Sequence, residues 1–257
     1  MPDSKGNEKD LKLIALDMDG TLLNHENDIS EGNKQAISEA IKQGIHVVIS
    51  TGRTIMTCKK LVEPLKLSSY VITTNGSEIW DSDFVLVERQ LLGCDHIEQM
   101  LNLRNTHNTS FWAASVDKVW RDEIPEDVTK HEWLKFGFDI EDDEIREKVL
   151  EELRKNTGLE ISNSSPTNIE VNAVGINKAA ALVKVTERLG LTMDNVIAMG
   201  DSLNDIAMIS EAGIGVAMGN AQDIVKETAD WVTDTNVEDG VAKAIRHWVL
   251  NPKRSSV

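Results

Sequence analysis

Short apolar runs alternate with amphipathic segments at both ends of this chain, and a different pattern separates the two ends. Near-continuous apolar strands joined by helices are typical of a parallel sheet that is covered on both faces. We expect such strands over residues 11–17, 45–50, 70–73, 195–199 and 213–217. The alternation therefore predicts an α/β fold whose core is a Rossmann-like, doubly wound parallel sheet.

Helix signals fill the spaces between these strands. Ser30 is a typical N-cap for a helix that runs to Gln43, and Gly44 suits the position that follows the helix. These helices would supply the layers that cover the two faces of the sheet. Further helices are expected over residues 54–65, 177–189, 203–211, 221–227 and 237–249.

The strand–helix rhythm stops near residue 76. Apolar residues at 79–80 and 84–87 flank the turn-like Asp-Ser-Asp of residues 81–83, which predicts a hairpin. Residues 89–172 carry more charge and most of the aromatic side chains. Their predicted order is helix, two strands, short helix, strand, helix and two strands, which indicates a separate α+β unit.

We therefore predict a core domain from residues 11–88 and 173–257, interrupted by an inserted domain at residues 89–172. Residues 1–10 are polar and lack the apolar region of a signal peptide, so we expect them to form a disordered tail. No apolar stretch reaches the roughly 20 residues that a membrane span needs. A cytoplasmic protein is expected.

The chain carries 43 acidic and 27 basic residues, a formal net charge of −16. This balance disfavours a nucleic-acid backbone or an anionic membrane as partner, because both need a basic surface. It does not disfavour a small anionic ligand held in a pocket. The two cysteines, Cys58 and Cys94, lack metal-ligand spacing and indicate free thiols. We expect a monomer or a small homo-oligomer.

Two carboxylates lie two residues apart at the end of the first expected strand. Asp17 and Asp19 tend to share a side because side chains alternate along a strand, and Gly20 then lets the chain turn sharply. Two such carboxylates repel each other unless a cation or a shared proton relieves them. The pair therefore indicates chemistry rather than packing.

Ligands of open parallel sheets bind beyond the carboxyl ends of the strands. Polar residues suited to one task follow the expected strands or begin the expected helices. They stand at residues 17–21, 50–53, 177–178 and 200–205.

Together these segments resemble the four motifs of the haloacid dehalogenase-like hydrolase superfamily, and most closely its Cof-type sugar-phosphatase branch. Residues 17–21, Asp-Met-Asp-Gly-Thr, match the first motif, and residues 200–205, Gly-Asp-Ser-Leu-Asn-Asp, match the fourth. Thr-Gly-Arg at residues 51–53 fits the second motif. The third departs slightly, because Ala179 stands where the branch usually has glycine after its lysine, Lys178.

The resemblance implies a role for each residue. Asp17 would be the nucleophile that forms an aspartyl-phosphate, and Asp19 would be the general acid and base. The residues implied to bind phosphate are Thr51, Gly52, Lys178 and Asn204. Mg²⁺ is the implied cofactor, and its implied ligands are the Asp17 carboxylate, the Asp19 carbonyl and the Asp201 carboxylate. Asp205 is implied to support these ligands without binding the ion.

Simpler interpretations stay open for several residues. Residues 51–52 are compatible with a plain turn, and Lys178 with a solvated helix start. Asp205 is equally compatible with capping its own helix. Arg53 is expected to pair with a nearby carboxylate.

The resemblance implies an α/β cap domain at residues 89–172, arranged αββαβαββ, that closes over the site and contacts the leaving group. It implies a Mg²⁺-dependent phosphatase of small phosphorylated metabolites: sugar phosphates, flavin-precursor phosphates or pyridoxal phosphate. A phosphomutase of sugar phosphates is an alternative. A non-catalytic metabolite sensor is another, although such a protein would be expected to have lost a nucleophile or a metal ligand.

Overall fold

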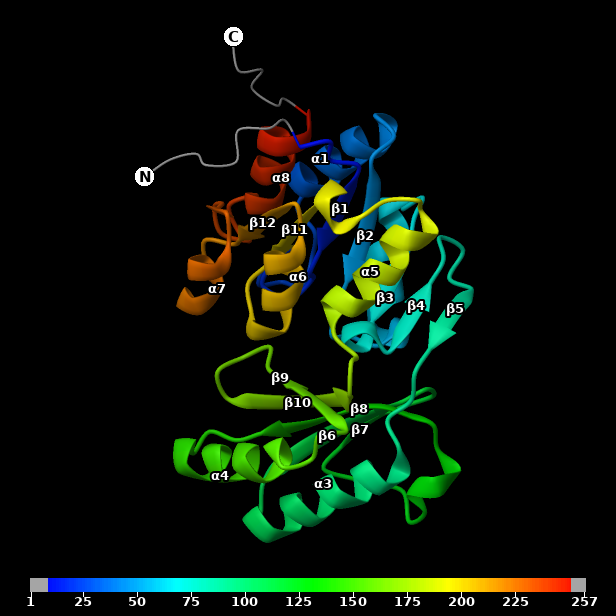
Figure 1. Cartoon of the computed structure of the whole chain (residues 1–257), viewed down its shortest axis with the longest axis vertical. Helices are drawn as coiled ribbons and strands as arrows, with labels where there is room; N and C mark the ends of the chain where they lie inside the picture. The colour runs from blue at the N-terminus through cyan, green and yellow to red at the C-terminus, as the bar shows by residue number, and fades with distance from the viewer. Residues whose placement is uncertain (1–8, 251–257) are drawn as a thin grey trace.

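The computed structural model describes residues 9–250, which form two β-sheets, one above the other (Figure 1). The larger sheet has eight strands in the order β13-β12-β11-β1-β2-β3-β4-β5. Their bounds are β1 Leu13–Leu16, β2 His46–Ser50, β3 Val71–Thr73, β4 Glu78–Trp80, β5 Leu86–Arg89, β11 Val196–Gly200, β12 Ile214–Ala217 and β13 Trp231–Val232. The expected α/β fold with a mostly parallel core sheet is confirmed.

Strand β1 lies at the centre of this sheet. It pairs in parallel with β2 on one side and with β11 on the other, so that Ala15 lies between Val48 and Ala198. The six strands from β13 to β3 are parallel, and β4 and β5 add an antiparallel edge. The carboxyl ends of β1, β2 and β11 therefore meet at one edge of the sheet.

Helices cover both faces of the parallel strands, as expected for a doubly wound sheet. Alternate residues of β1 enter different cores: Ile14 and Leu16 pack under one layer, Leu13 and Ala15 under the other. Helices α1 (Glu31–Lys42), α2 (Ile55–Val62), α7 (Asp223–Thr228) and α8 (Gly240–Ile245) contribute to the first core. Helices α5 (Lys178–Arg188) and α6 (Ile206–Glu211) contribute to the second.

Local signals set the ends of α1 as expected. The Ser30 side chain accepts a hydrogen bond from the Asn33 amide at 3.1 Å, which satisfies one of the free donors at the helix start. Gly44 follows the helix with φ of +82°, a conformation in which a side chain would be strained.

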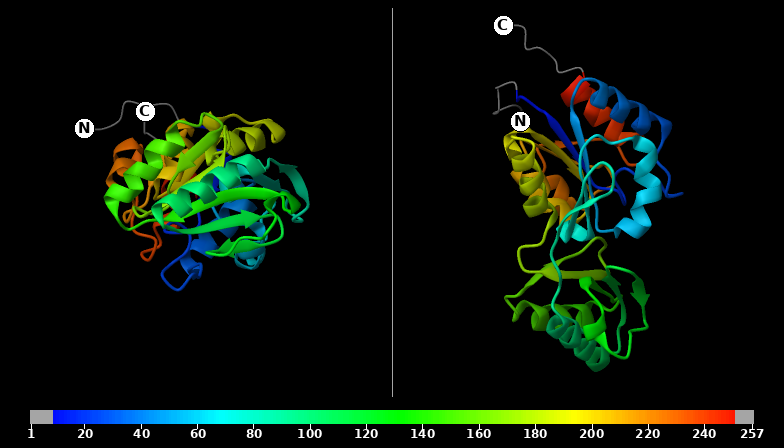
Figure 2. Two further views of the ribbon diagram at one scale, coloured as in Figure 1. Left: turned by 90° about the horizontal axis from the view of Figure 1, so that it is seen from below. Right: turned by 90° about the vertical axis from the view of Figure 1, so that its right-hand side faces the viewer.

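The smaller sheet has five antiparallel strands in the order β7-β6-β8-β10-β9. Helices α3 (Cys94–His107) and α4 (Asp143–Arg154) cover its face away from the larger sheet (Figures 1 and 2). Stacked Phe111 and Phe136, with centroids 5.3 Å apart, lie in the core between these helices and the sheet. The strands are β6 Ser110–Ser115, β7 Val119–Arg121, β8 Trp133–Asp139, β9 Leu159–Ser162 and β10 Asn168–Ala173.

The elements of this unit follow the expected order, with a 3₁₀ turn at Val128–Lys130 as the short helix. We propose that the cap spans residues 89–172 and that the core comprises residues 11–88 and 173–257, because the chain passes between the sheets close to these bounds, at the end of β5 and at the end of β10. Residues 251–257 of the proposed core lie outside the described residues. Of the predicted tail, residues 1–8 lie outside the described residues. The Asp10 carbonyl accepts a hydrogen bond from the Asn195 side chain.

Several expected elements have different bounds, and two of these differences follow from a residue with a positive φ. The final helix begins at Gly240 rather than near residue 237, because Asp239 has a left-handed φ of +57° and precedes it. The second hairpin strand begins at Leu86, because Phe84 also has a positive φ and belongs to the turn. Among residues 9–250, no helix is long and apolar enough to cross a membrane.

Cys58 gives a test of the core beneath α2. Its thiol is fully buried, and burial raises its pKa to about 12. Because the thiolate is the reactive form, we expect Cys58 in the native protein to resist alkylation at pH 8 and to react on denaturation. Half-buried Cys94 is expected to account for any native reactivity. Thiol counting with and without guanidinium, with C94S as the control, tests this; rapid native labelling of C94S would contradict it.

Candidate active site

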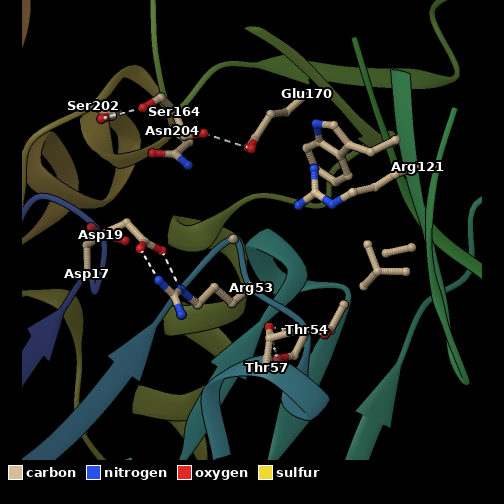
Figure 3. A pocket seen from close by; sticks show the side chains of 14 residues that line it. Asp17, Asp19, Arg53, Thr54, Thr57, Arg121, Ser164, Glu170, Ser202 and Asn204 are labelled. Carbon is tan, nitrogen blue, oxygen red and sulfur yellow. Dashed lines mark hydrogen bonds and ion pairs between the residues drawn. The ribbon is translucent and has the colours of Figure 1, made fainter. Parts of the chain in front are cut away.

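A cavity of about 240 Å³ lies between the carboxyl edge of the core sheet and the cap sheet (Figure 3). The segments that follow β1, β2 and β11 form its core side, and strands β6, β7 and β10 form its cap side. Its lining residues are Asp17, Asp19, Gly52, Arg53, Thr54, Thr57, Trp112, Ala114, Val119, Arg121, Ser164, Glu170, Ser202 and Asn204.

A buried lysine joins two buried carboxylates beside this cavity. Lys178 Nζ lies 2.6 Å from Asp17 Oδ1 and 2.7 Å from Asp205 Oδ1. Helix α5 begins at Lys178, and its N-cap Asn177 accepts a hydrogen bond from the Ala180 amide, which fixes the helix start. The lysine is only 1% exposed, so it is not a solvated helix-start residue.

Asp205 has two functions in the loop after β11. Its Oδ2 accepts hydrogen bonds from the backbone amides of Asp201 and Ser202, and its Oδ1 accepts from Lys178. It therefore caps its own helical turn and also orients the lysine. The capping interpretation is therefore confirmed, and a role of Asp205 behind a metal site stays a prediction.

Burial and neighbouring charges together shift the pKa values of this cluster. Burial raises the pKa of Asp17 well above the ordinary value, and the Lys178 ammonium opposes that rise. Burial disfavours the charged form of Lys178, but Asp17 and Asp205 outweigh it and hold its pKa above the usual value. Burial and the neighbouring charge of Asp205 raise the pKa of Asp201 to about 6. These acids would be stabilised as anions by a further cation.

The donor set fits a hard divalent cation. Oxygens of Asp17, Asp201 and Asp205 all lie within 4.8 Å of one another. Both Asp205 oxygens are already hydrogen-bonded, whereas Asp17 Oδ2 accepts no hydrogen bond from the described residues. Asp201 accepts from the Thr21 and Ser202 hydroxyls, which leaves lone pairs on both of its oxygens. Asp17 and Asp201 are therefore the carboxylates best placed to hold a metal ion.

Gly20 permits the close approach of the first and fourth segments. It has φ of +79°, and a Cβ atom there would lie 2.4 Å from Asp201 Oδ2. Any side chain at this position would displace the Asp201 carboxylate. The glycine after the two acids is thus required by the carboxylate cluster as well as by the turn.

Arg53 binds the second acid of the pair. Its Nε lies 2.8 Å from Asp19 Oδ2, and its Nη2 lies 2.5 Å from Oδ1, a two-pronged ion pair that confirms the expected carboxylate partner (Figure 3). Arg53 also donates to the Asn27 side chain at 2.9 Å. Asp19 is half-exposed, unlike buried Asp17, so the two acids have different environments.

In the loop after β2, Gly52 lines the cavity. The neighbouring Thr51 is fully buried and does not line it. The Thr51 hydroxyl oxygen accepts a hydrogen bond from the Arg53 amide at 3.1 Å, and its own proton remains available to another acceptor. The Thr51 amide donates to the Ile72 carbonyl, which ties the loop to the end of β3.

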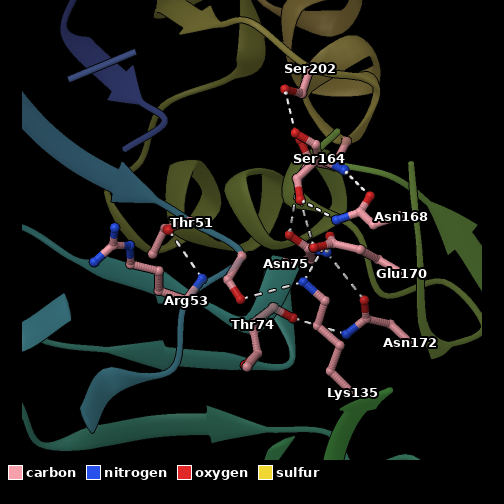
Figure 4. Close-up of polar contacts among 12 residues, drawn as sticks. Thr51, Arg53, Thr74, Asn75, Lys135, Ser164, Asn168, Glu170, Asn172 and Ser202 are labelled. Carbon is pink, nitrogen blue, oxygen red and sulfur yellow. Dashed lines mark hydrogen bonds and ion pairs between the residues drawn. The ribbon is translucent and has the colours of Figure 1, made fainter. Parts of the chain in front are cut away.

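A buried polar network joins the core to the cap (Figure 4). Lys135 of β8 lies 2.7 Å from Glu170 of β10, and both side chains are at most 5% exposed. Asn75, which follows β3, donates to Glu170 at 2.8 Å, and Asn204 donates to Asn75 at 3.4 Å. The Lys135 ammonium also lies 3.4 Å from the Gly52 carbonyl. The cap therefore contacts the backbone of the phosphate-site candidates directly.

Burial and charge attraction act in opposite directions on the pKa values of this ion pair. Burial favours the neutral form of Glu170, but Lys135 outweighs it and holds the pKa of Glu170 below its usual value. Burial lowers the pKa of Lys135, and Glu170 opposes that shift. Breaking this pair would leave an uncompensated buried charge, which costs more than the pair itself contributes.

Comparison with known proteins identifies the family. The family model of haloacid dehalogenase-like hydrolases matches residues 14–133 and 121–245. The chain belongs to the haloacid dehalogenase-like hydrolases. The predicted membership, in the Cof-type phosphatase branch, is confirmed.

A relative from Bacillus subtilis named 5-amino-6-(5-phospho-D-ribitylamino)uracil phosphatase YcsE is 76% identical to this hydrolase over 241 residues. The match covers 94% of this chain and 97% of the relative. A haloacid dehalogenase-like hydrolase structure from B. subtilis superposes with a TM-score of 0.85 at 26% identity, over 92% of this chain and 99% of that one. One from Bacteroides thetaiotaomicron gives 0.76 at 31%, over 92% and 98%.

These likenesses show that the hydrolase is a phosphatase, a phosphoric monoester hydrolase, which argues against the alternative of a non-catalytic sensor. The structure brings its candidate residues together at one edge of the core sheet. Four of them line the cavity: Asp17, Asp19, Gly52 and Asn204. Lys178 contacts Asp17, and Thr51 is buried beside Gly52.

Sequence reasoning missed the contribution of the cap. Lys135 and Glu170 are charged residues that each lie between two apolar neighbours in a strand, and both side chains are buried. A charge in such a position needs a partner, so this pattern was the available signal. The partner itself depends on strand pairing that residue spacing does not reveal.

Removal of the buried lysine tests the charge cluster. We expect K178M to lower the free energy of unfolding by about 3–5 kcal/mol, because it leaves the buried Asp17 and Asp205 carboxylates without their cation. K184M on the same helix is the control: Lys184 pairs with half-exposed Glu88, and its loss should cost less than about 1 kcal/mol. Urea unfolding in Mg²⁺-free buffer measures both, and equal stabilities would contradict this account of the cluster.

Proposed function

We propose that this protein hydrolyses 5-amino-6-(5-phospho-D-ribitylamino)uracil, releasing inorganic phosphate and the dephosphorylated ribitylamino compound. The observation that carries the proposal is the 76% identity to YcsE along nearly the whole of both chains. The cavity supports it, since it is small, lies partly in the cap and joins an acidic cluster to an aromatic and a basic side chain. A small phosphorylated metabolite fits this setting better than a macromolecule.

Asp17 is the proposed nucleophile. One oxygen of its carboxylate attacks phosphorus, the bond from phosphorus to the ribityl oxygen breaks, and an aspartyl-phosphate forms. Water then attacks this acyl phosphate, releases phosphate and restores the carboxylate. The Lys178 ammonium on Asp17 Oδ1 supports this role, because it fixes the carboxylate and places a positive charge where phosphoryl charge develops.

Asp19 is the proposed proton carrier. In the first step it would protonate the leaving ribityl oxygen, and in the second it would take a proton from the attacking water. Its exposure and its position on the cavity wall support this role. In the structure, Arg53 donates hydrogen bonds to the Asp19 carboxyl group. The acid step therefore needs this group to turn from Arg53 toward the leaving oxygen.

Backbone and polar groups would hold the phosphoryl oxygens in place. We assign this task to the Thr51 hydroxyl, the Gly52 amide, the Lys178 ammonium and the Asn204 side chain. The Asn75–Asn204 contact and the buried Lys135–Glu170 pair support it, since they fix these groups before substrate enters.

The Asp17 and Asp201 carboxylates and the Asp19 carbonyl are the groups that would hold Mg²⁺, with Asp205 fixing the loop behind them. When bound, the ion would neutralise charge on the phosphoryl oxygens as the bond to the leaving group breaks. The phosphomutase alternative differs in outcome, because it would transfer phosphate within a sugar without net release.

Replacement of the nucleophile tests the proposal. We expect D17N to lower kcat for the aminouracil substrate and for p-nitrophenyl phosphate by more than about 10³-fold, because an amide cannot form the acyl phosphate. D83N, in the exposed hairpin turn, should behave as wild type. Released phosphate and the melting temperature are measured together. Turnover by a folded D17N protein would refute Asp17 as the nucleophile.

Chelation tests the cofactor. Treatment with EDTA should reduce phosphate release to background, and added Mg²⁺ should restore it, because the Asp17–Asp201 cluster would otherwise repel the phosphate. Phosphate release that is unchanged after extensive chelation would exclude a metal requirement. Calorimetry of Mg²⁺ binding to wild type and D201N separates loss of the ion from other effects of the chelator.

A further inference from the structure

One face of the cap sheet looks toward the core, and its side chains can be read from the strand register. Arg121 of β7 lies opposite Trp112 of β6, Trp112 lies opposite Gly137 of β8, and Gly137 lies opposite Glu170 of β10. Directly opposed residues in an antiparallel sheet point to the same face. These four residues therefore form one row across the cap sheet, which we call the cap row.

The cap row forms a wall of the active-site cavity. Arg121, Trp112 and Glu170 all line it, together with Ala114 and Val119 from the neighbouring row. The opposite face of the same sheet holds the apolar core beneath α3 and α4. Trp112 and Arg121 are thus not part of the apolar core that holds the cap together.

Gly137 lets the Trp112 indole lie against the sheet. A Cβ atom at residue 137 would lie 2.3 Å from Cε2 and 2.4 Å from Cζ2 of Trp112, so the ring covers the glycine. The Lys135 ammonium lies 5.1 Å from the ring centroid. Trp112 is half-buried and lines the cavity, so part of the indole remains available to a ligand.

Arg121 points into the same space. Its side chain is exposed, and its guanidinium makes no hydrogen bond or ion pair with any residue between 9 and 250. Figure 3 shows it extending from the cap, on the side of the cavity opposite Asp17. A leaving group attached to a phosphate at Asp17 would extend toward this arginine.

We propose that Trp112 and Arg121 form the subsite that recognises the ring end of the leaving group. The indole stacks on a flat heterocycle, and the guanidinium donates hydrogen bonds to the ring carbonyl oxygens. The inference rests on the proposed function, since a uracil ring supplies both the flat face and the carbonyl oxygens. The ribityl chain then spans the distance between this subsite and the phosphate.

A pair of substrates tests the subsite. Ribitol 5-phosphate carries the same phosphorylated chain without the ring. We expect W112A to lower kcat/KM for the aminouracil substrate by about tenfold to a hundredfold, as stacking on an aromatic side chain commonly contributes. Its kcat/KM for ribitol 5-phosphate should fall less than about threefold. W112F, which keeps an aromatic face, should recover most of the loss.

Arg121 is tested in the same way. We expect R121A to lower kcat/KM for the aminouracil substrate by about tenfold, the effect of one lost charged hydrogen bond, and to spare ribitol 5-phosphate. R154A is the matched control, because Arg154 is exposed at the end of α4 and, among residues 9–250, pairs only with Glu147. It should leave both substrates unchanged. Melting temperatures show whether each variant is folded, and W112F remains informative if W112A is not.

The outcomes separate the subsite from the function. If wild type hydrolyses the aminouracil substrate but W112A and R121A lose equal factors on both substrates, the ring subsite is wrong and the function stands. Wild-type rates for the aminouracil substrate from W112A and R121A would also overturn the subsite. If wild type does not hydrolyse this substrate while it hydrolyses other phosphate esters, the proposed function fails and the subsite fails with it.

Discussion

The contact of Lys178 with Asp17 and Asp205 is the interaction on which the rest of the site depends. Three carboxylates converge where β1 and β11 end, and one ammonium group lies among them. This leaves an excess of negative charge, which a divalent cation is suited to balance and a phosphate alone is not. The helix start at Lys178, the turn at Gly20 and the capping role of Asp205 all serve to keep these charges close together.

The cap contributes to the site at two levels. Its buried Lys135–Glu170 pair contacts Asn75 and the carbonyl of Gly52, so it helps to set the shape of the core loops. Its half-buried Trp112 and exposed Arg121 line the same cavity as Asp17 and Asp19. The core therefore supplies the groups proposed to break the phosphate ester, while the cap supplies the surface proposed to recognise what the ester carries.

The proximity of Asp17 to the loop that carries Asp205 could be predicted from the sequence, because both follow parallel strands and the carboxyl ends of such strands share one edge of a sheet. Lys178 begins a helix after a cap strand, so its place beside Asp17 was predicted from the family resemblance. The parallel core followed equally from its apolar runs. The Lys135–Glu170 contact with Asn75 could not be predicted, since it depends on how the inserted unit sits on the core. The late start of α8 depends on the backbone conformation of a single residue, Asp239, which hydrophobic spacing does not report.

The central place of β1 has a consequence for how the molecule is made. Its partner β11 lies beyond the whole cap in the sequence, so a growing polypeptide carries an incomplete core sheet while the cap strands are synthesised. All strand pairs of the cap, by contrast, join segments between β6 and β10. Local pairings form faster than distant ones. The ribosome therefore delivers the complete cap first, and the Asp17–Lys178–Asp205 cluster can form only when the C-terminal third emerges.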